Sequence, residues 1–387
     1  ITGLTMVVFF LPSFFAGVPA PVLAQIAIDT HKTSGTALGA MFASGAVGAI
    51  AGVLLAGFVF ISWLGSTMTL VVVALLYVAT GIGFFWLARS KGLGLACVVG
   101  LVALVLSGFA LATPAQCERE SQYFCLRMED LSANPDSPVH LMVIDHLAHG
   151  ISARDFPEVM FTEHTAMLHG LALRRALRED FTSFHIGGGS YSVPRAFAAG
   201  GAGAITVAEI DPEVTQLAED AFWFDPDSAH VLHEDARRAL LTRPEQRYDV
   251  ILGDAFTDVV VPVHLVTQEF FELAASRLTE NGTFMMNVID HEDRLGALAS
   301  IIATMDRVFP VVEVWTHQAP PAAGQRMVFV VVAGQSPTPM DSFTAPAPDQ
   351  MRFGALADGM VQQLASTRGM ILSDDYAPID RLMGRPD

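Results

Sequence analysis

Residues 183–212 read SFHIGGGSYSVPRAFAAGGAGAITVAEIDP, and this stretch decides the class of fold. Its pattern predicts a strand over 183–186, a glycine loop, a short helix and a second strand over 204–210. Three consecutive glycines let the backbone turn tightly and approach a ligand without a Cβ atom in the way. Pro194 suits the first turn of a helix, where its missing N–H costs nothing.

Glu209 ends the second strand about 20 residues after the glycines, the spacing at which an acidic side chain holds two ribose hydroxyls in a βαβ nucleotide site. The alternative is an ordinary strand–helix turn followed by a surface glutamate. The glycines and the acidic strand end together favour a nucleoside site. We expect its backbone and side chains to come from Gly187, Gly188, Gly189, Ser190 and Glu209.

The same alternation continues downstream. Further strands are predicted over 229–232, 249–253, 282–288, 311–316 and 327–333, with helices between them and one before them at 162–177. This order predicts an α/β, doubly wound sheet of about seven strands. A small β-hairpin subdomain is expected over 114–160, the Rossmann-like domain over 161–335, and a Pro-rich linker and tail over 336–387.

Acidic residues also follow the later strands, where ligands bind in such sheets. Asp235 is placed to take an adenine amino group, Asp254 ends a wholly apolar strand, and Asp290 follows the fifth strand. Each alone is better explained as a helix-capping carboxylate, but their joint placement at successive strand ends favours a binding site. Asp254 is the best candidate for a general base or an amine-orienting carboxylate. No metal is expected, because the histidines and cysteines lack zinc-ligand spacing.

Charge separates the chain into two parts. Residues 1–113 carry only Asp29, Lys32, Arg89 and Lys91, a net of +2, which leaves −20 on the rest of a chain whose formal net charge is −18. The acidic part argues against a nucleic-acid partner, because phosphate contacts need clustered Lys and Arg. Ile1 is not an initiator methionine, so we expect a fragment or a processed product.

The first part contains apolar runs of the ~20 residues that a membrane-spanning helix needs. There are about four, at Leu4–Ile28, Ala37–Trp63, Met68–Ala88 and Leu93–Ala112. The second run has a stripe of small residues, Ser44, Gly48, Gly52 and Ala56, which allows close packing of another helix. We expect transmembrane helices that anchor the chain in a lipid bilayer and offer a surface to membrane-protein partners.

The motifs of the second part resemble the spermidine synthase (polyamine aminopropyltransferase) family, and most closely its membrane-fused bacterial branch. The resemblance rests on Gly187-Gly188-Gly189, Glu209-Ile210-Asp211, Asp235-Ala236 and the run from Tyr248 to Ala255. It implies a class I methyltransferase-like fold, a small N-terminal β subdomain, and a site for S-adenosylmethionine or its decarboxylated form. By position, Glu209 would hold the ribose, Asp235 and Ala236 the adenine, and Asp254 would act on an attacking amine.

Several positions depart from the family pattern. Ser190-Tyr191 stands where the family has Asp-Gly, and Asp254-Ala255-Phe256-Thr257-Asp258 replaces its Asp-Ser-(Ser/Thr)-Asp-Pro loop. His149 takes the place of a glutamine. The expected function is a membrane-anchored transferase that alkylates a small amine acceptor. The alternatives are an S-adenosylmethionine-dependent methyltransferase and a non-catalytic subunit of a membrane complex.

The side of the membrane on which the second part lies follows from two opposed observations. If all four runs cross, the few basic residues place it outside the cytoplasm, where Cys117 and Cys125 can pair. The nucleoside donor, however, is made in the cytoplasm. We therefore expect a multi-pass protein of the bacterial cytoplasmic membrane with a cytoplasmic second part.

Overall fold

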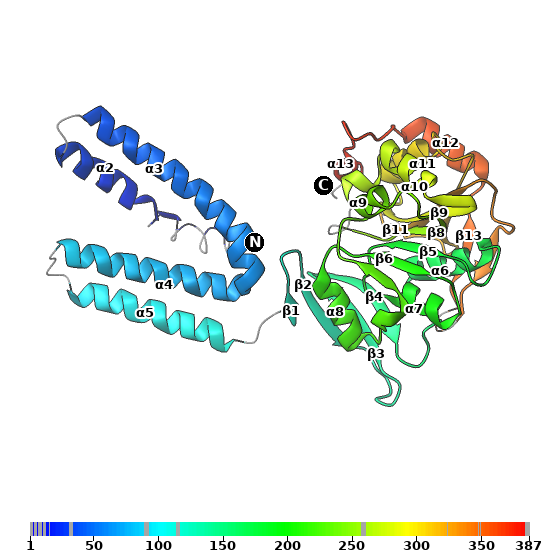
Figure 1. Ribbon diagram of the computed structural model, residues 1–387, viewed down its shortest axis with the longest axis horizontal. Coiled ribbons are helices and arrows are strands. Elements are labelled where there is room, and N and C mark those ends of the chain that lie inside the picture. The colour runs from blue at the N-terminus through cyan, green and yellow to red at the C-terminus, as the bar shows by residue number, and fades with distance from the viewer. Residues whose placement is uncertain are drawn as a thin grey trace. The chain divides into compact units, whose positions relative to one another are not determined.

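The computed structural model describes residues 16–30, 34–88, 93–113, 117–256, 261–322, 324–346 and 350–383, together with residues 3, 6, 10, 13, 14 and 348. The chain divides into two compact units, Ile1–Pro114 and Ala115–Asp387 (Figure 1).

Unit 1 is made of apolar helices, and their positions follow the predicted apolar runs. They are α2 (Pro19–Thr30), α3 (Ser34–Leu55), the π-helical η1 (Ala56–Ile61), α4 (Ser62–Ala88) and α5 (Leu93–Ala112). Within α4 the backbone leaves the helical region at Gly65, with φ 70° and ψ 175°, so the chain turns there (Figure 1). This turn falls in the predicted gap between the second and third runs.

Among the described residues, one helix, Leu38–Trp86, is long and apolar enough to cross a membrane by length and composition. Four crossings remain a prediction. The basic residues on which the predicted orientation depends, Lys32, Arg89 and Lys91, lie outside the described residues.

Unit 2 is built on a nine-stranded mixed sheet in the order β12-β13-β10-β11-β9-β8-β5-β6-β7. Strands β5 to β8 and the start of β9 pair in parallel, and the remaining pairs are antiparallel. The strands are β5 (Ser183–Ile186), β6 (Ile205–Ala208), β7 (His230–Leu232), β8 (Tyr248–Gly253), β9 (Leu278–His291), β10 (Val311–His317), β11 (Arg326–Gly334), β12 (Ser342–Thr344) and β13 (Arg352–Ala355).

Each face of this sheet has its own hydrophobic core, because side chains alternate along the strands. In β8, for example, Ile251 faces one core and Val250 and Leu252 face the other. The first core packs α9 (Ala236–Thr242), α10 (Gln268–Ser276), α11 (Gly296–Met305), α12 (Asp358–Arg368) and α13 (Ile379–Leu382). The second packs α6 (Glu163–Arg175), α7 (Ser192–Ala199) and α8 (Pro212–Ala221). Two 3-10 turns, η2 (Pro226–Ser228) and η3 (Val263–Leu265), complete the unit.

A separate four-stranded antiparallel sheet, β1-β2-β3-β4, precedes α6. It consists of β1 (Arg119–Glu120), β2 (Cys125–Asp130), β3 (Val139–Ile144) and β4 (Leu147–Ala153). It packs Leu126 and Met142 into the second core. The predicted hairpin corresponds to β2 and β3, and the structure adds a strand on either side.

The segment expected to be a Pro-rich linker differs from that expectation. It contains β12, which pairs with β13, and β13 in turn extends the main sheet beyond β10. Phe343 and Phe353 are buried there, with ring centroids 5.5 Å apart. Burial of aromatic side chains holds these short strands. This is a tertiary effect, so the strand propensity of the local, proline-rich sequence does not reveal it.

The chain passes from β5 through β6 to β7 and then returns to place β8 on the opposite side of β5. The order of the parallel strands therefore reverses between β5 and β8. In open α/β sheets this reversal point, at the carboxyl ends of the strands, is where ligands bind.

Candidate active site

The glycine loop after β5 lies at this reversal point. Gly187 and Gly189 have φ of 90° and 52°, which favour glycine. The Gly187 N–H donates to the Ala208 carbonyl over 2.9 Å, and the Asp254 N–H donates to the Ile186 carbonyl over 3.0 Å. A Cβ atom on Gly187 would lie 2.8 Å from the Asp254 carbonyl oxygen. The fold thus brings the loop and the end of β8 into contact.

The Tyr191 side chain packs against the glycine loop at Gly188. Its side chain is fully buried and its hydroxyl lies 2.7 Å from the Thr215 hydroxyl. A Cβ atom on Gly188 would meet the Tyr191 ring at 2.3 Å, so the ring fills the space that the glycine leaves. Burial raises the pKa of Tyr191, since it disfavours the phenolate, and the nearby charge of Glu209 adds to the shift. Tyr191 is therefore a neutral structural wedge.

Glu209 follows β6 and binds the loop directly. Its Oε2 accepts from the Gly188 N–H over 2.8 Å and its Oε1 accepts from the Asp211 N–H over 2.9 Å. Burial raises the pKa of Glu209, while the N–H groups of Asp211 and Gly188 oppose that shift. A carboxylate offers about four acceptor positions. Glu209 can therefore accept from a ribose hydroxyl while it holds Gly188.

Asp254, at the end of β8, is fixed by two side chains from other elements. Its Oδ1 accepts from the Asn287 amide in β9 over 2.9 Å, and its Oδ2 lies 3.6 Å from Nε2 of His164 in α6. The Asp254 side chain remains 28% exposed. The carboxylate is thus oriented yet accessible. The predicted loop continues through Thr257 and Asp258, which lie outside the described residues.

Asp235 caps α9, with its Oδ1 accepting from the Arg238 N–H over 2.9 Å. Its Oδ2 also lies 2.7 Å from Nε2 of His264. The hydrogen bond from His264 lowers the pKa of Asp235 despite partial burial. Asp235 is therefore a capping carboxylate with an additional histidine partner, and Ala236 is the first residue of α9. Both follow β7, which is separated from β8 in the sheet by two strands, β5 and β6.

Asp290 is a helix-capping residue and not a ligand-binding carboxylate at a strand end. Its Oδ2 accepts from the N–H groups of Ala297 and Leu298, each over 3.0 Å, at the start of α11. The side chain is buried, and burial raises its pKa. Asp290 caps this helix.

The glycine loop and Asp254, the candidate general base, line a small cavity of about 30 Å³. Its lining includes five of the predicted site residues: Gly187, Gly188, Gly189, Ser190 and Asp254. His149 and His185 also line it, whereas Glu209, Asp235 and Ala236 do not. Within the described ranges, no three metal-ligating side chains gather at a common point.

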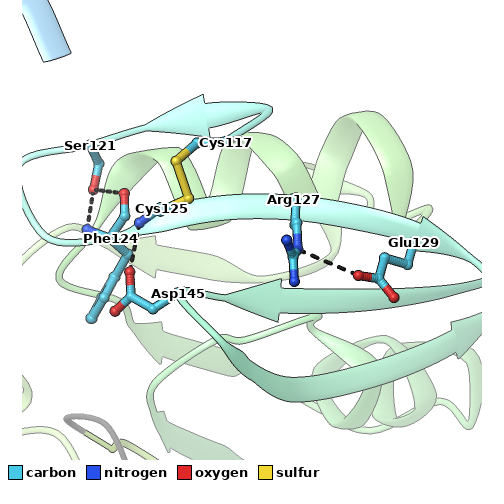
Figure 2. Close-up of a disulfide and its surroundings, with 7 residues drawn as sticks. All are labelled: Cys117, Ser121, Phe124, Cys125, Arg127, Glu129 and Asp145. Carbon is cyan, nitrogen blue, oxygen red and sulfur yellow. Dashed lines mark hydrogen bonds and ion pairs between the residues drawn. A yellow bond between two sulfur atoms is a disulfide. The ribbon is translucent and has the colours of Figure 1, made fainter. Parts of the chain in front are cut away.

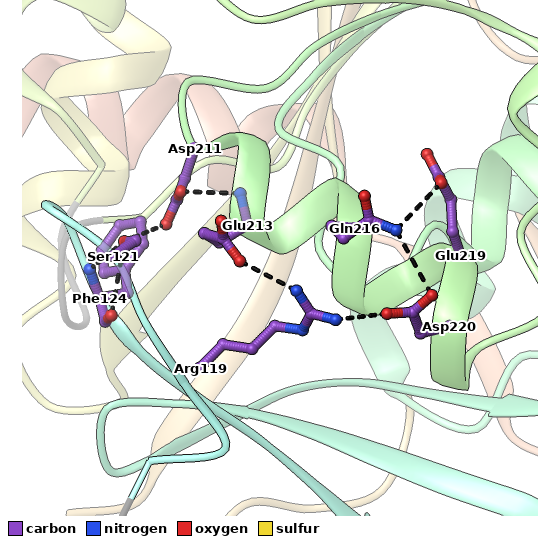
Figure 3. A network of polar contacts seen from close by, with 8 residues as sticks. All are labelled: Arg119, Ser121, Phe124, Asp211, Glu213, Gln216, Glu219 and Asp220. Carbon is purple, nitrogen blue, oxygen red and sulfur yellow. Dashed lines mark hydrogen bonds and ion pairs between the residues drawn. The ribbon is translucent and has the colours of Figure 1, made fainter. Parts of the chain in front are cut away.

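A disulfide braces the small sheet beside this site. Cys117 is bonded to Cys125, which begins β2, and Figure 2 shows Ser121 in the loop that the bond closes. The Ser121 hydroxyl donates to Asp211 Oδ2 over 2.5 Å, and Asp211 Oδ1 caps α8 at the Glu213 N–H (Figure 3). The β1–β2 loop is thereby tied to the segment that carries Glu209.

Arg119 adds a second tie between the same elements. Its guanidinium bridges Glu213, over 3.1 Å, and Asp220, both on α8. Figure 3 shows Arg119 reaching along this helix from β1, beside the Ser121–Asp211 bond. The partners are about one-third to one-half exposed, so we expect this pair to contribute modestly to stability.

The C-terminal Asp374-Asp375-Tyr376 run is held to the main domain through Asp374. Asp374 accepts two bonds from Arg237, at 2.7 and 2.6 Å, and one from the Thr267 hydroxyl at 2.8 Å. This anchors the run at the first turns of α9 and α10. The Tyr376 side chain, in contrast, is 59% exposed. The run is anchored at one residue and does not line the cavity described above.

Sequence reasoning missed the partners of the predicted carboxylates: Asn287, His164, His264 and Ser121. Asn287 lies in the predicted strand over 282–288, where a polar residue within an apolar strand was the available signal. Ser121 and His264 carry no such signal, because their partners are distant in sequence.

Comparison with known proteins agrees with this geometry. Residues 183–342 match the sequence profile of the Spermine/spermidine synthase domain. A polyamine aminopropyltransferase of Vibrio vulnificus is 33% identical over 131 residues, covering 32% of this chain and 40% of that protein. An N-terminal histidine N-methyltransferase of Emericella nidulans is 30% identical over 132 residues, covering 33% of this chain and 23% of that protein. The matches thus span less than half of either relative.

The fold has a solved counterpart. The crystal structure of a probable spermidine synthase from Corynebacterium glutamicum superposes with a TM-score of 0.57 at 21% identity, covering 71% of this chain and 100% of that one. This confirms the predicted methyltransferase-like Rossmann α/β fold. Residues 183–342, with their glycine loop and strand-end carboxylates, thus match the Spermine/spermidine synthase domain, and the resemblance to the spermidine synthase family is confirmed.

Proposed function

We propose that unit 2 is a transferase that moves an alkyl group from a sulfonium nucleoside to an amine. The donor would be S-adenosylmethionine or its decarboxylated form, and the acceptor a small amine. One observation carries the proposal: an accessible carboxylate, Asp254, is fixed by Asn287 and His164 against a glycine loop at the strand-order reversal.

In this proposal the acceptor nitrogen gives a proton to the Asp254 carboxylate and attacks the carbon next to the sulfonium. The new C–N bond forms as the C–S bond breaks, and the electron pair of that bond neutralises the sulfur as a thioether. The protein has little bond chemistry of its own to perform. Orientation of the two reactants supplies much of the acceleration, and the fixed position of Asp254 serves that orientation.

The donor would be held by the residues around the loop. Gly189 has open space where a Cβ atom would stand, and Ser190 lines the cavity. Glu209 would accept from the ribose, and Asp235 with Ala236 would meet the adenine. Asp235 already serves Arg238 and His264, so it would use a remaining lone pair.

Methyl transfer is the second candidate, and the resemblance to an N-methyltransferase favours it. The two reactions leave different nucleosides. Transfer of a methyl group from S-adenosylmethionine leaves S-adenosylhomocysteine, whereas transfer of the propyl-containing arm leaves methylthioadenosine. Chromatography of the nucleoside product therefore separates them.

The test uses the full chain in mild detergent with either donor and a panel of small amines. We expect Asp254→Asn to lower turnover by about 100-fold or more while methylthioadenosine still binds. Asp375→Asn, at an exposed position of the tail, is the control and should keep wild-type turnover. Unchanged turnover in folded Asp254→Asn protein would remove the proposed role of Asp254. Absence of turnover by the wild type with either donor and every amine would instead refute the transferase proposal and favour a non-catalytic membrane subunit.

We also propose that unit 1 anchors the chain in a bilayer, because its helices expose large apolar side chains. Trp63 is 82% exposed, Trp86 78% and Val53 74%. Resistance to extraction by alkaline carbonate would support this anchor, and release would contradict it. The stripe at Ser44, Gly48, Gly52 and Ala56 would be where a partner helix packs.

For the side of the membrane we propose the cytoplasmic face of a bacterial inner membrane, where the donor is made. The Cys117–Cys125 disulfide favours an oxidising compartment instead. Unit 2 contains arginines but no lysine, so digestion of spheroplasts with trypsin, which does not cross the membrane, decides between the faces. Cleavage of unit 2 only after the membrane is permeabilised supports the proposal, and cleavage without permeabilisation refutes it.

A further inference from the structure

The hydroxyl of Ser190 is buried beside the glycine loop without a hydrogen-bond partner. The residue is only 3% exposed, and its Oγ has no partner among the described residues. The side chain lines the small cavity together with Gly189 and Asp254. A buried hydroxyl left unpaired costs free energy of desolvation, so a ligand group that bonds to it would recover that cost.

The start of α7 faces the same cavity. Ser192, Val193 and Pro194, the first three residues of α7, are among the lining residues. Within the described chain, no side chain caps this helix. The first N–H groups of a helix have no intrahelical acceptor and carry partial positive charge. This end of the cavity therefore favours a negative group and disfavours an ammonium.

The balance of charge in the cavity agrees with that preference. Among its described lining residues, Asp254 is the only carboxylate, and it already serves Asn287 and lies near His164. A decarboxylated donor brings an ammonium and a sulfonium with no negative charge of its own. The intact donor carries its own carboxylate, which offsets one of those positive charges.

We propose that the Ser190 hydroxyl and the N-terminus of α7 bind a carboxylate, so that the donor of this chain is a sulfonium nucleoside that keeps its amino-acid carboxylate. The inference rests on the proposed transferase function and narrows its donor. It admits transfer of a methyl group or of an arm that still bears the carboxylate. It excludes decarboxylated S-adenosylmethionine as the preferred donor.

Calorimetric titration of the full chain in detergent tests the inference with three ligands: S-adenosylmethionine, its decarboxylated form and methylthioadenosine, which lacks the amino-acid arm. We expect the intact donor to bind at least about tenfold more tightly than the decarboxylated one. Ser190→Ala should weaken the intact donor by about tenfold and leave methylthioadenosine unchanged. Ser190→Asp should reverse the preference.

Ser152→Ala is the matched control. Ser152 is 2% exposed and its hydroxyl also has no partner among the described residues, but it does not line the cavity. This variant should keep the wild-type preference. Ser190→Asp could crowd Gly150, whose Cβ position lies 2.2 Å from Ser190 Oγ, so Ser190→Ala carries the test if the aspartate variant unfolds.

Two results would overturn the inference while the proposed function survives: tighter binding of the decarboxylated donor by wild type, or an unchanged preference in Ser190→Ala. A folded chain that binds none of the three ligands would refute the proposed function, and this inference with it.

Discussion

The side-chain amide of Asn287, in β9, donates to Asp254 at the end of β8 over 2.9 Å. Asn287 is 2% exposed, and its own Oδ1 has no partner among the described residues. The Asn287 amide is buried, so bulk water does not compete with the Asp254 carboxylate for this hydrogen bond. This makes Asn287 a positioning residue for Asp254.

Asn287→Ala should therefore lower kcat by about 10- to 100-fold, because a misplaced carboxylate meets the acceptor poorly. The KM for the nucleoside donor should stay near the wild-type value, since Asn287 does not line the cavity at the glycine loop. Steady-state kinetics measure both. Asn281→Ala, at an exposed position of the same strand, should change neither; a parallel rise in KM for Asn287→Ala would indicate general damage to the site.

Gly188→Ala should destabilise unit 2 by about 1–3 kcal/mol, the cost of overpacking a filled core. The added methyl group would collide with Tyr191, which is buried against Phe224 with ring centroids 4.1 Å apart. Denaturant titration followed by far-UV circular dichroism measures the loss. Gly359→Ala, with open space at its Cβ position in α12, should be neutral or slightly stabilising. Equal stability of both variants would show that the Tyr191 ring can move aside to accommodate the added methyl group without a measurable cost in stability.

The glycine loop shows how far the sequence could predict this site. The strand, loop and helix at 183–199, the end of β6 at Glu209 and the approach of Asp254 all followed from local patterns and strand order. The wedge under the loop did not, because Tyr191 adopts φ 54°, an unusual value for a bulky residue. Its place depends on Thr215 and Phe224, which come from other elements.

The strands that the sequence did not predict also depend on contacts between elements that are distant in sequence. Long apolar strands such as β8 and β11 were predicted, whereas β12 and β13 were not, because each has only three or four residues and is held by Phe343, Phe353 and Trp315. Local propensity carries little weight in such short strands.

Asp374→Ala should loosen the C-terminal tail. Asp374 is bonded to Arg237 and Thr267, and its side chain is 43% exposed, so we expect a cost of about 1 kcal/mol after allowance for solvent screening. Limited proteolysis should cut the tail faster in this variant. Asp375→Ala is the control and should match wild type. An unchanged cleavage rate in Asp374→Ala would mean that the buried apolar side chains of the tail, Leu372, Ile379 and Met383, hold it.

Unit 2 should lose stability as the pH falls below neutral. Burial lowers the pKa of His169 from 6.5 to about 4 and that of His185 from 6.5 to about 3. Between 6.5 and those values the unfolded chain binds more protons, so stability falls as pH falls, by up to about 1.4 kcal/mol per pH unit for each histidine. Glu209, whose pKa burial raises, acts in the opposite sense.

His169→Gln isolates one of these contributions. Urea denaturation at pH 7, 6 and 5 should show a shallower loss of stability than in wild type. His230→Gln, at an exposed position, should keep the wild-type slope. A wild-type slope in His169→Gln would show that folding does not lower the pKa of His169.

The Cys117–Cys125 bond also determines how mechanical load enters unit 2. Cys117 follows the boundary of unit 1 by a few residues, and β1 is a two-residue strand that could be peeled from β2 one pair at a time. With the bond closed, tension applied through the connecting chain passes from Cys117 directly to Cys125, the first residue of the six-residue β2. The loop that carries Ser121 lies outside this force path. Its contact with Asp211 is therefore shielded from tension that reaches unit 2 through the connecting chain.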